Sequence, residues 1–304
     1  MNDYDVIIIG AGPAGLTAAI YVQRAGYRSV VLEEYVAGGQ MANTPEVENY
    51  PAVGKISGVE LGMNLYNQVL EQGAQVEFDG VASADLTGKV KSVVTQSGRK
   101  ITAGAVIIAN GAKRRKLGVP GEEEYSGRGV SYCATCDGMF YRGKTVVVVG
   151  GGNTAVSDVL YLSRLCEKVY LVHRRDTLRA SKVYLDPLQK AENVEFVWDS
   201  EVKQLLRDQA VTGVRVRNKK TGEERDIPCD GVFVAVGYLP NTELYRGQVE
   251  LDEAGYVLAD ETTQTNLPGV FAVGDLRKKP LRQVVTAASD GAVAAHFIEE
   301  YLNQ

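Results

Sequence analysis

Two cysteines separated by two residues are the strongest chemical signal in the sequence. Cys133 and Cys136 form a CxxC motif, whereas Cys166 and Cys229 are isolated and resemble small buried hydrophobic residues. A structural zinc site would need two further ligands, and the sequence offers no second close cysteine pair and only two histidines. A structural disulfide is disfavoured without a secretory context. A redox dithiol remains, because this spacing lets a disulfide form and open reversibly and lowers the pKa of one thiol.

Asp137 follows the cysteine pair directly and has two interpretations. A carboxyl group at this position can transfer a proton when a thiolate forms or leaves. An aspartate here can equally cap a turn or a short helix. The residues alone leave both interpretations open.

A glycine-rich segment near the N-terminus predicts a dinucleotide site. Gly10, Gly12 and Gly15 follow an unbroken apolar run, with Pro13 and Ala14 between the last two, and a helix-length segment comes next. The three glycines permit a tight turn, a close approach to a pyrophosphate and close packing of the helix on the strand. Glu33 lies at the end of the next apolar run, where a carboxylate accepts bonds from ribose hydroxyls and repels a 2′-phosphate. This site therefore suits FAD or NAD.

Two further segments favour FAD over NAD at the first site. Gly39 and Gln40 follow Glu33 closely, in position to line the flavin ring and its ribityl chain. Asp275 ends an apolar strand pattern, at the edge where open α/β sheets bind ligands. We expect Asp275 to hold a ribityl hydroxyl.

A second glycine-rich segment repeats the first with the opposite charge. Gly150 and Gly152 are followed by Asn153 and Thr154, and the next apolar run ends in basic residues rather than in an acid. These basic residues are His173, Arg174 and Arg175, with Arg179 a turn later. Guanidinium groups bind phosphate oxygens in pairs. Because the cations occupy the offset at which the first site has Glu33, the second site is predicted to bind NADPH.

The repeated layout predicts the architecture. Gly10 and Glu33 are 23 positions apart, as are Gly150 and His173, and each pair frames a strand, a turn, a helix and a strand. We expect an α/β fold with two Rossmann-like, three-layer dinucleotide-binding domains, the NADPH domain inserted in the FAD domain. The predicted FAD domain comprises residues 1–112 and 245–304, and the NADPH domain, which carries the CxxC motif, comprises residues 113–244.

Charge and apolar patterning argue against a nucleic-acid-binding, a secreted or a membrane protein. The 304-residue chain has a net charge of -5, which argues against a nucleic-acid partner. Its N-terminus lacks the pattern of a signal peptide, and its apolar runs are shorter than the roughly 20 residues that span a bilayer. We therefore expect a cytoplasmic protein with no membrane or metal site.

Taken together, these motifs resemble those of the low-molecular-weight thioredoxin reductases of bacteria. The resemblance covers essentially the whole chain, and besides the motifs above it includes residues 45–51 and 282–284. It implies a homodimer with one FAD per subunit, in which NADPH reduces the flavin, the flavin reduces the disulfide, and the dithiol reduces thioredoxin. It also implies a rotation of the two domains about the crossings near Gly111 and Tyr245.

The resemblance assigns roles to single residues. Cys136 is expected to face the flavin, Cys133 to attack thioredoxin and Asp137 to act as the acid, while Arg174, Arg175 and Arg179 hold the 2′-phosphate. The remaining residues expected at the NADPH site are Gly150, Gly152, Asn153, Thr154 and His173. The residues expected at the FAD site are Gly10, Gly12, Pro13, Ala14, Gly15, Glu33, Gly39, Gln40, Asn49, Gly111, Asp275, Arg282, Gln283 and Val284.

One departure from the family pattern concerns the segment before Arg282. Leu281 stands where the family usually has a tyrosine, and Arg277, Lys278 and Lys279 precede it. We expect these basic residues to form a solvated loop, with attraction of an acidic thioredoxin as the alternative.

Two other functions remain to be separated from thioredoxin reduction. A dithiol oxidase, or the reductase module of a peroxide-reducing system, would use the same cysteine pair, but an oxidase would not need the basic residues at the second site. A flavin-binding redox sensor would carry the same motifs and turn over slowly.

Overall fold

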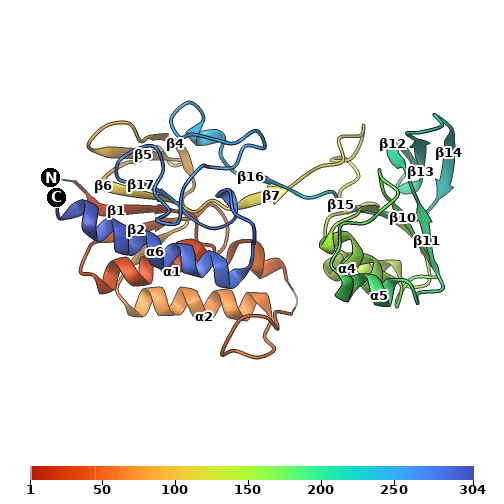
Figure 1. Cartoon of the computed structure of the whole chain (residues 1–304), viewed down its shortest axis with the longest axis horizontal. Coiled ribbons are helices and arrows are strands. Elements are labelled where there is room, and N and C mark those ends of the chain that lie inside the picture. The colour runs from red at the N-terminus through yellow and green to blue at the C-terminus, as the bar shows by residue number, and fades with distance from the viewer. Residues whose placement is uncertain (1, 45) are drawn as a thin grey trace. The chain divides into compact units, whose positions relative to one another are not determined.

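The computed structural model describes residues 2–44 and 46–304. Pro45, the first residue of the motif at 45–51, lies outside the described residues. The chain divides into two compact units (Figure 1). One contains the chain up to Lys113 together with Leu239–Gln304, and the other is Arg114–Tyr238. The second unit is therefore inserted in the first, as predicted.

The second crossing between the units lies earlier than the expected position 245. Residues 239–244 belong to the first unit, since Asn241 donates a backbone hydrogen bond of 3.0 Å to the carbonyl oxygen of Gly111. The Tyr245 hydroxyl, which is fully buried, donates to the side chain of Asn110. At the crossings themselves, strand β7 (Ala112–Arg114) pairs with β16 (Tyr238–Pro240).

The first unit contains a mixed sheet with the order β3-β2-β1-β6-β5-β4. Its strands β1, β2, β3 and β6 are parallel, while β4 and β5 form an antiparallel extension. The far end of β6 pairs in parallel with β17. The strands are β1 (Tyr4–Ile9), β2 (Ser29–Leu32), β3 (Gln75–Glu77), β4 (Val81–Asp85), β5 (Lys91–Thr95), β6 (Lys100–Ile108) and β17 (Val270–Ala272).

Three helices cover one face of this sheet (Figure 1). They are α1 (Pro13–Arg24), α2 (Gly58–Glu71) and α6 (Val284–Leu302). Side chains of β1 alternate between two apolar clusters: Val6 and Ile8 pack with helix residues, and Ile7 and Ile9 pack on the other face. Because both faces are covered, the strand reads in sequence as an unbroken apolar run.

The second unit repeats this plan with a parallel sheet of order β11-β10-β9-β15-β8. The helices pack against one face and a small antiparallel sheet, β12-β13-β14, against the other, so that three layers result. The parallel strands are β8 (Val130–Ser131), β9 (Thr145–Gly150), β10 (Lys168–Val172), β11 (Val194–Val197) and β15 (Gly231–Ala235). The antiparallel strands are β12 (Ser200–Arg207), β13 (Val211–Asn218) and β14 (Glu224–Pro228), and the helices are α3 (Ala134–Asp137), α4 (Asn153–Leu162) and α5 (Lys182–Leu188).

The two units confirm the predicted fold class, two Rossmann-like dinucleotide-binding folds with one inserted in the other. In each unit the glycine-rich turn joins the first strand to the first helix, from β1 to α1 and from β9 to α4. None of the helices in the described part of the chain is long and apolar enough to cross a membrane.

Candidate redox and dinucleotide sites

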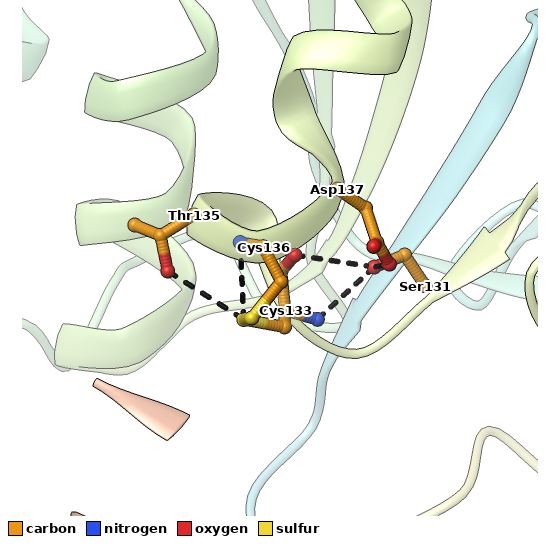
Figure 2. Close-up of a disulfide and its surroundings, with 5 residues drawn as sticks. All are labelled: Ser131, Cys133, Thr135, Cys136 and Asp137. Carbon is orange, nitrogen blue, oxygen red and sulfur yellow. Dashed lines mark hydrogen bonds between the residues drawn. A yellow bond between two sulfur atoms is a disulfide. The ribbon is translucent and has the colours of Figure 1, made fainter. Parts of the chain in front are cut away.

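The predicted cysteine pair forms a disulfide at the start of α3 (Figure 2). The Cα atoms of Cys133 and Cys136 are 5.3 Å apart. Cys136 is exposed and Cys133 half-buried. The backbone N–H of Cys136 donates to Cys133 Sγ at 3.2 Å, and the Thr135 hydroxyl lies 3.5 Å from the same sulfur. The disulfide is thus at the surface, with polar groups around one of its sulfurs.

The Asp137 side chain is held by a buried serine. Ser131 Oγ donates to Asp137 Oδ2 at 2.6 Å and accepts a bond of 3.0 Å from the backbone N–H of Cys133. Figure 2 shows the Asp137 carboxylate directed at Ser131, while the disulfide lies toward Thr135. No sequence motif singled out Ser131; its position at the end of a short strand before the cysteines was the only signal.

The remaining cysteines are buried thiols, as expected. Burial raises the pKa of Cys166 to about 11 and that of Cys229 to about 12, so both stay protonated at neutral pH. The described residues contain no cluster of histidine, cysteine and carboxylate side chains able to hold a metal ion.

The first glycine turn has the shape that a pyrophosphate requires. Gly10 has a φ of +110°, and a Cβ there would lie 2.5 Å from the carbonyl oxygen of Ala109. A Cβ on Gly15 would collide with the Gly10 carbonyl. By contrast, a Cβ on Gly12 would meet nothing within 4 Å, and Gly12 caps α1 without a side-chain bond. The N-terminus of α1, which includes Pro13 and Ala14, therefore faces open space that suits a phosphate.

Glu33 lies beside this turn at the end of β2. Its Oε2 accepts the backbone N–H of Ala11 at 2.7 Å. Its Oε1 accepts the N–H groups of Glu34 and Tyr35 at 2.9 and 3.1 Å. These bonds fix the carboxylate at the edge of the glycine turn, where the ribose of a bound dinucleotide would lie.

The residues expected around the flavin converge at the carboxyl ends of β1, β6 and β17. Gln40 Nε2 donates to Asp275 Oδ2 at 3.5 Å. A Cβ on Gly39 would lie 3.1 Å from Gly12 Cα, and one on Gly111 would lie 3.9 Å from Gln40 Nε2. At Gly39 a side chain would crowd the first glycine turn, and Gln40 links this region to Asp275.

The carboxyl group of Asp275 is not freely solvated. Burial raises its pKa, an effect that the positive charges of Arg282 and Lys279 oppose. A partly buried acceptor just beyond the end of β17 suits a hydroxyl donor such as that of a ribityl chain.

The segment before α6 adds the last three expected residues. Arg282 Nε donates to the carbonyl oxygen of Asp275 at 3.2 Å. Gln283 caps α6, of which Val284 is the first residue, and its Oε1 accepts a bond of 2.9 Å from Asn49 Nδ2. The structure thus brings Asn49 to this segment from a distant part of the chain.

The expectation of a solvated basic loop is wrong for Arg277 and Lys279. Their side chains are only 7% and 5% exposed, and they pair with Asp290 at 3.0 and 2.7 Å. Asp290 Oδ2 also accepts the backbone N–H of Gly274 at 2.9 Å. Only Lys278 is exposed. Asp290 could not be predicted from the sequence, because a single acid among the alanines of α6 gives no hint that it faces inward.

The second glycine turn repeats the open geometry of the first. Gly150 has a φ of +157°, and a Cβ there would collide with the carbonyl oxygen of Ala235. A Cβ on Gly152, which caps α4, would meet nothing within 4 Å. Asn153 and Thr154 form the exposed first turn of α4. The N-terminus of α4 therefore faces open space, as that of α1 does.

The basic loop that follows β10 folds onto this glycine turn. The backbone N–H of Arg179 donates to the carbonyl oxygen of Gly151 at 2.8 Å. The N–H of Ser181 donates to Asn153 Oδ1, also at 2.8 Å. These two bonds hold the loop beside the space at Gly152.

Unlike the arginines that follow it, His173 is buried. The residue is 4% exposed, and its ring lies against Gly151, where a Cβ would collide with it. Burial lowers its pKa, and the charges of Arg174 and Arg179 act in the same direction. Among the described residues His173 Nε2 has no hydrogen-bond partner. His173 is therefore a buried, neutral group beneath the turn.

The three arginines of the loop keep their charges available. Arg174, Arg175 and Arg179 are exposed, and within the described part of the chain their guanidinium groups make no ion pair. The neighbouring acid, Asp176, pairs at 3.1 Å with Lys220 instead. Three free cations on the loop next to this open helix N-terminus form a region of high positive charge that suits an anion.

Comparison with known proteins agrees with this geometry. Residues 4–291 match the family described as pyridine nucleotide-disulphide oxidoreductase. The chain is 46% identical to a thioredoxin reductase of Listeria innocua over 302 residues, which cover 99% of this chain and 94% of the relative. It is 47% identical to a thioredoxin reductase of Streptomyces coelicolor over 301 residues, 98% and 94% of the two chains.

A solved structure supports the same conclusion. The crystal structure of Lactococcus lactis thioredoxin reductase superposes with a TM-score of 0.93 at 42% identity and covers 99% of both chains. The resemblance inferred from the motifs is therefore confirmed. The chain belongs to the thioredoxin reductases of bacterial type, within the pyridine nucleotide-disulphide oxidoreductase family.

Proposed function

We propose that this protein is an NADPH-dependent thioredoxin-disulfide reductase that uses one FAD per subunit and the Cys133/Cys136 pair. The observation that carries the proposal is the exposed disulfide, which lies in the same unit as the glycine turn with three free arginines. Bound FAD would supply the two-electron relay between NADPH and this disulfide.

The two glycine turns support different ligands. Glu33 sets a negative charge at the first turn, which favours ribose hydroxyls and disfavours a 2′-phosphate. Arg174, Arg175 and Arg179 set positive charges at the second, where Arg179 is held by its bond to Gly151. We assign FAD to the first unit and NADPH to the second on this contrast of charge.

The groups around the two sulfurs support different roles for Cys133 and Cys136. Once the disulfide is reduced, a thiolate on Cys133 has the N–H of Cys136 and the hydroxyl of Thr135 as donors. We propose that Cys133 attacks the disulfide of thioredoxin. Cys136 then attacks Cys133 and forms the Cys133–Cys136 disulfide again. Asp137 supplies a proton to the departing thiolate and recovers it from Cys136.

A protein partner is supported by the surface next to the pair. Met139 and Phe140 are 53% and 73% exposed, which is unusual for large apolar side chains. We propose that thioredoxin covers them when its disulfide reaches Cys133. The same proposal implies a cytoplasmic location, because thioredoxin reduction would draw on the NADPH of the cytoplasm.

The homodimer that the resemblance implies is supported by a second apolar surface. Val59, Met63 and Leu70 are exposed on α2, and Phe78 is exposed nearby in the sequence. We propose that the first unit forms the dimer contact. Light scattering after size-exclusion chromatography tests this proposal: it expects about twice the chain mass of 32.9 kDa, and a monomer at micromolar concentration would contradict it.

The activity is tested with FAD-loaded protein, oxidised thioredoxin and NADPH. The expected result is NADPH oxidation that depends on thioredoxin and is lost in Cys133→Ser and Cys136→Ser. Cys166→Ser is the matched control, since this thiol is buried and should leave the rate unchanged. NADPH oxidation with oxygen alone, unaffected by thioredoxin, would instead identify an oxidase.

A further inference from the structure

We propose that Ser131 is a positioning residue that holds Asp137 by one carboxylate oxygen and so leaves the other oxygen, Oδ1, to carry the proton during dithiol–disulfide exchange. The inference rests on the proposed function. Ser131 itself carries neither a sulfur atom nor a charge. The inference is carried by the bonds of Ser131 alone (Figure 2).

Ser131 is fixed by the sheet of its own unit. It ends β8, which pairs in parallel with β15 so that Ser131 lies opposite Phe233. The residue is 3% exposed. A hydroxyl in this setting cannot exchange its partners with water, and its geometry is set by β8 before α3 begins at Ala134.

Two acceptors compete for the single proton of the Ser131 hydroxyl. A serine hydroxyl has one proton to donate. Its oxygen accepts the Cys133 N–H at 3.0 Å, and its proton has two acceptors in reach, Asp137 Oδ2 at 2.6 Å and the Cys133 carbonyl at 3.3 Å. The shorter bond, to a carboxylate, is the stronger. Oδ2 is therefore occupied by Ser131, and Asp137 is tied through the hydroxyl to the backbone of Cys133.

This arrangement assigns the proton steps to Oδ1. The Cys133 thiolate attacks one sulfur of the partner's disulfide, the partner's S–S bond breaks, and the departing thiolate takes the proton from Asp137. Cys136 then gives its proton to the Asp137 carboxylate and attacks Cys133 Sγ. The mixed disulfide breaks, the Cys133–Cys136 bond forms again, and the second partner sulfur leaves as a thiolate. Two electrons pass to the partner, and Asp137 ends in its starting form.

A double-mutant cycle tests whether Ser131 acts through Asp137. Pre-reduced, FAD-loaded protein is mixed with oxidised thioredoxin, and free thiols on thioredoxin are counted after rapid acid quench and alkylation. We expect Ser131→Ala to slow exchange about tenfold, the effect of one lost bond to a charged group, and Ser131→Thr to restore most of it. In the Asp137→Asn background, Ser131→Ala should change the rate less than twofold.

Equal slowing by Ser131→Ala in both backgrounds would overturn the proposal, because it would show a structural effect that is independent of the acid. Ser163→Ala is the matched control: its hydroxyl donates to the carbonyl oxygen of Leu160 at 3.0 Å in the same unit, so its loss should leave the rate unchanged. If wild-type protein does not reduce thioredoxin at all, the proposed function fails rather than the role of Ser131.

Discussion

The phenol of Tyr132 donates a 2.6 Å hydrogen bond to Glu122 Oε1 immediately before the first redox cysteine. The buried Glu122 also accepts the backbone N–H groups of Leu117 and Gly118 at 2.6 and 2.7 Å. Burial, reinforced by this bond, raises the pKa of Tyr132, which therefore stays a donor. One carboxylate thus joins the loop at 117–118 to the segment that carries Cys133.

The contacts of Glu122 predict that two variants lose stability to different extents. Tyr132→Phe removes one hydrogen bond and should lower the free energy of unfolding by about 1 kcal/mol, whereas Glu122→Ala strands three donors and should cost roughly 2–4 kcal/mol. Urea denaturation measures both. Glu123→Ala, which removes a surface pair with Lys116, is the control and should cost less than about 1 kcal/mol. Equal losses for Glu122→Ala and Glu123→Ala would contradict the role given to Glu122.

The buried charges around Asp290 predict a large effect of a nearly isosteric change. Asp290→Asn leaves Arg277 and Lys279 buried without their shared counter-ion, which should destabilise the first unit by roughly 3–5 kcal/mol. It should also weaken FAD binding, because the same loop carries Asp275 and Arg282. Thermal unfolding and FAD titration of the apoprotein measure the two effects. Lys278→Ala, at the exposed position between the two, should change neither.

The free arginines predict a selective loss of affinity for NADPH. Removing the guanidinium group of Arg174 or Arg175 deletes charge-assisted bonds to the 2′-phosphate and should raise KM for NADPH about 10- to 100-fold, with little change for NADH. Steady-state kinetics with both nucleotides measure the ratio. Arg225→Ala removes an exposed arginine of the same unit that pairs with Glu195, and should leave the preference intact. A parallel loss with NADH would mean that the arginines support the loop rather than read the phosphate.

Asp158 predicts a pH dependence of stability. Burial raises its pKa to about 7, although the charge of Arg114 opposes the shift. An acid whose pKa is raised on folding contributes stability below its unfolded value near 4, and that stability is lost as pH rises toward 7. Asp158→Asn should therefore have little effect on the melting temperature at pH 4 and raise it increasingly up to pH 8. A constant difference across this range would contradict the assignment.

Local patterns were sufficient to predict the fold and both glycine turns. Unbroken apolar runs such as Val6–Ile9 indicate strands buried on both faces, and the crowding at Gly10 and Gly150 explains why only glycine occupies these turns. The insertion of one unit in the other could be inferred because the second copy of the pattern interrupts the first.

The contacts that fix the sites could not be predicted in the same way. Asp290 meets Arg277 across a helix and a loop, and Asn49 meets Gln283 across 234 positions. Ser131 and Glu122 are ordinary residue types whose roles depend on which neighbours the sheet presents. The motif groups His173 with the basic residues of the second site, but its position under Gly151 is set by packing after β10, which periodicity does not resolve.

The central claim is that electrons from NADPH reach thioredoxin through Cys133 and Cys136. It is tested most directly by adding one equivalent of NADPH per subunit to the FAD-loaded protein without oxygen, then alkylating free thiols and locating them by mass spectrometry. We predict labels on Cys133 and Cys136 after NADPH, far fewer after NADH, and their loss when oxidised thioredoxin is added before alkylation. A disulfide that stays closed while NADPH is consumed and thioredoxin becomes reduced would contradict the account.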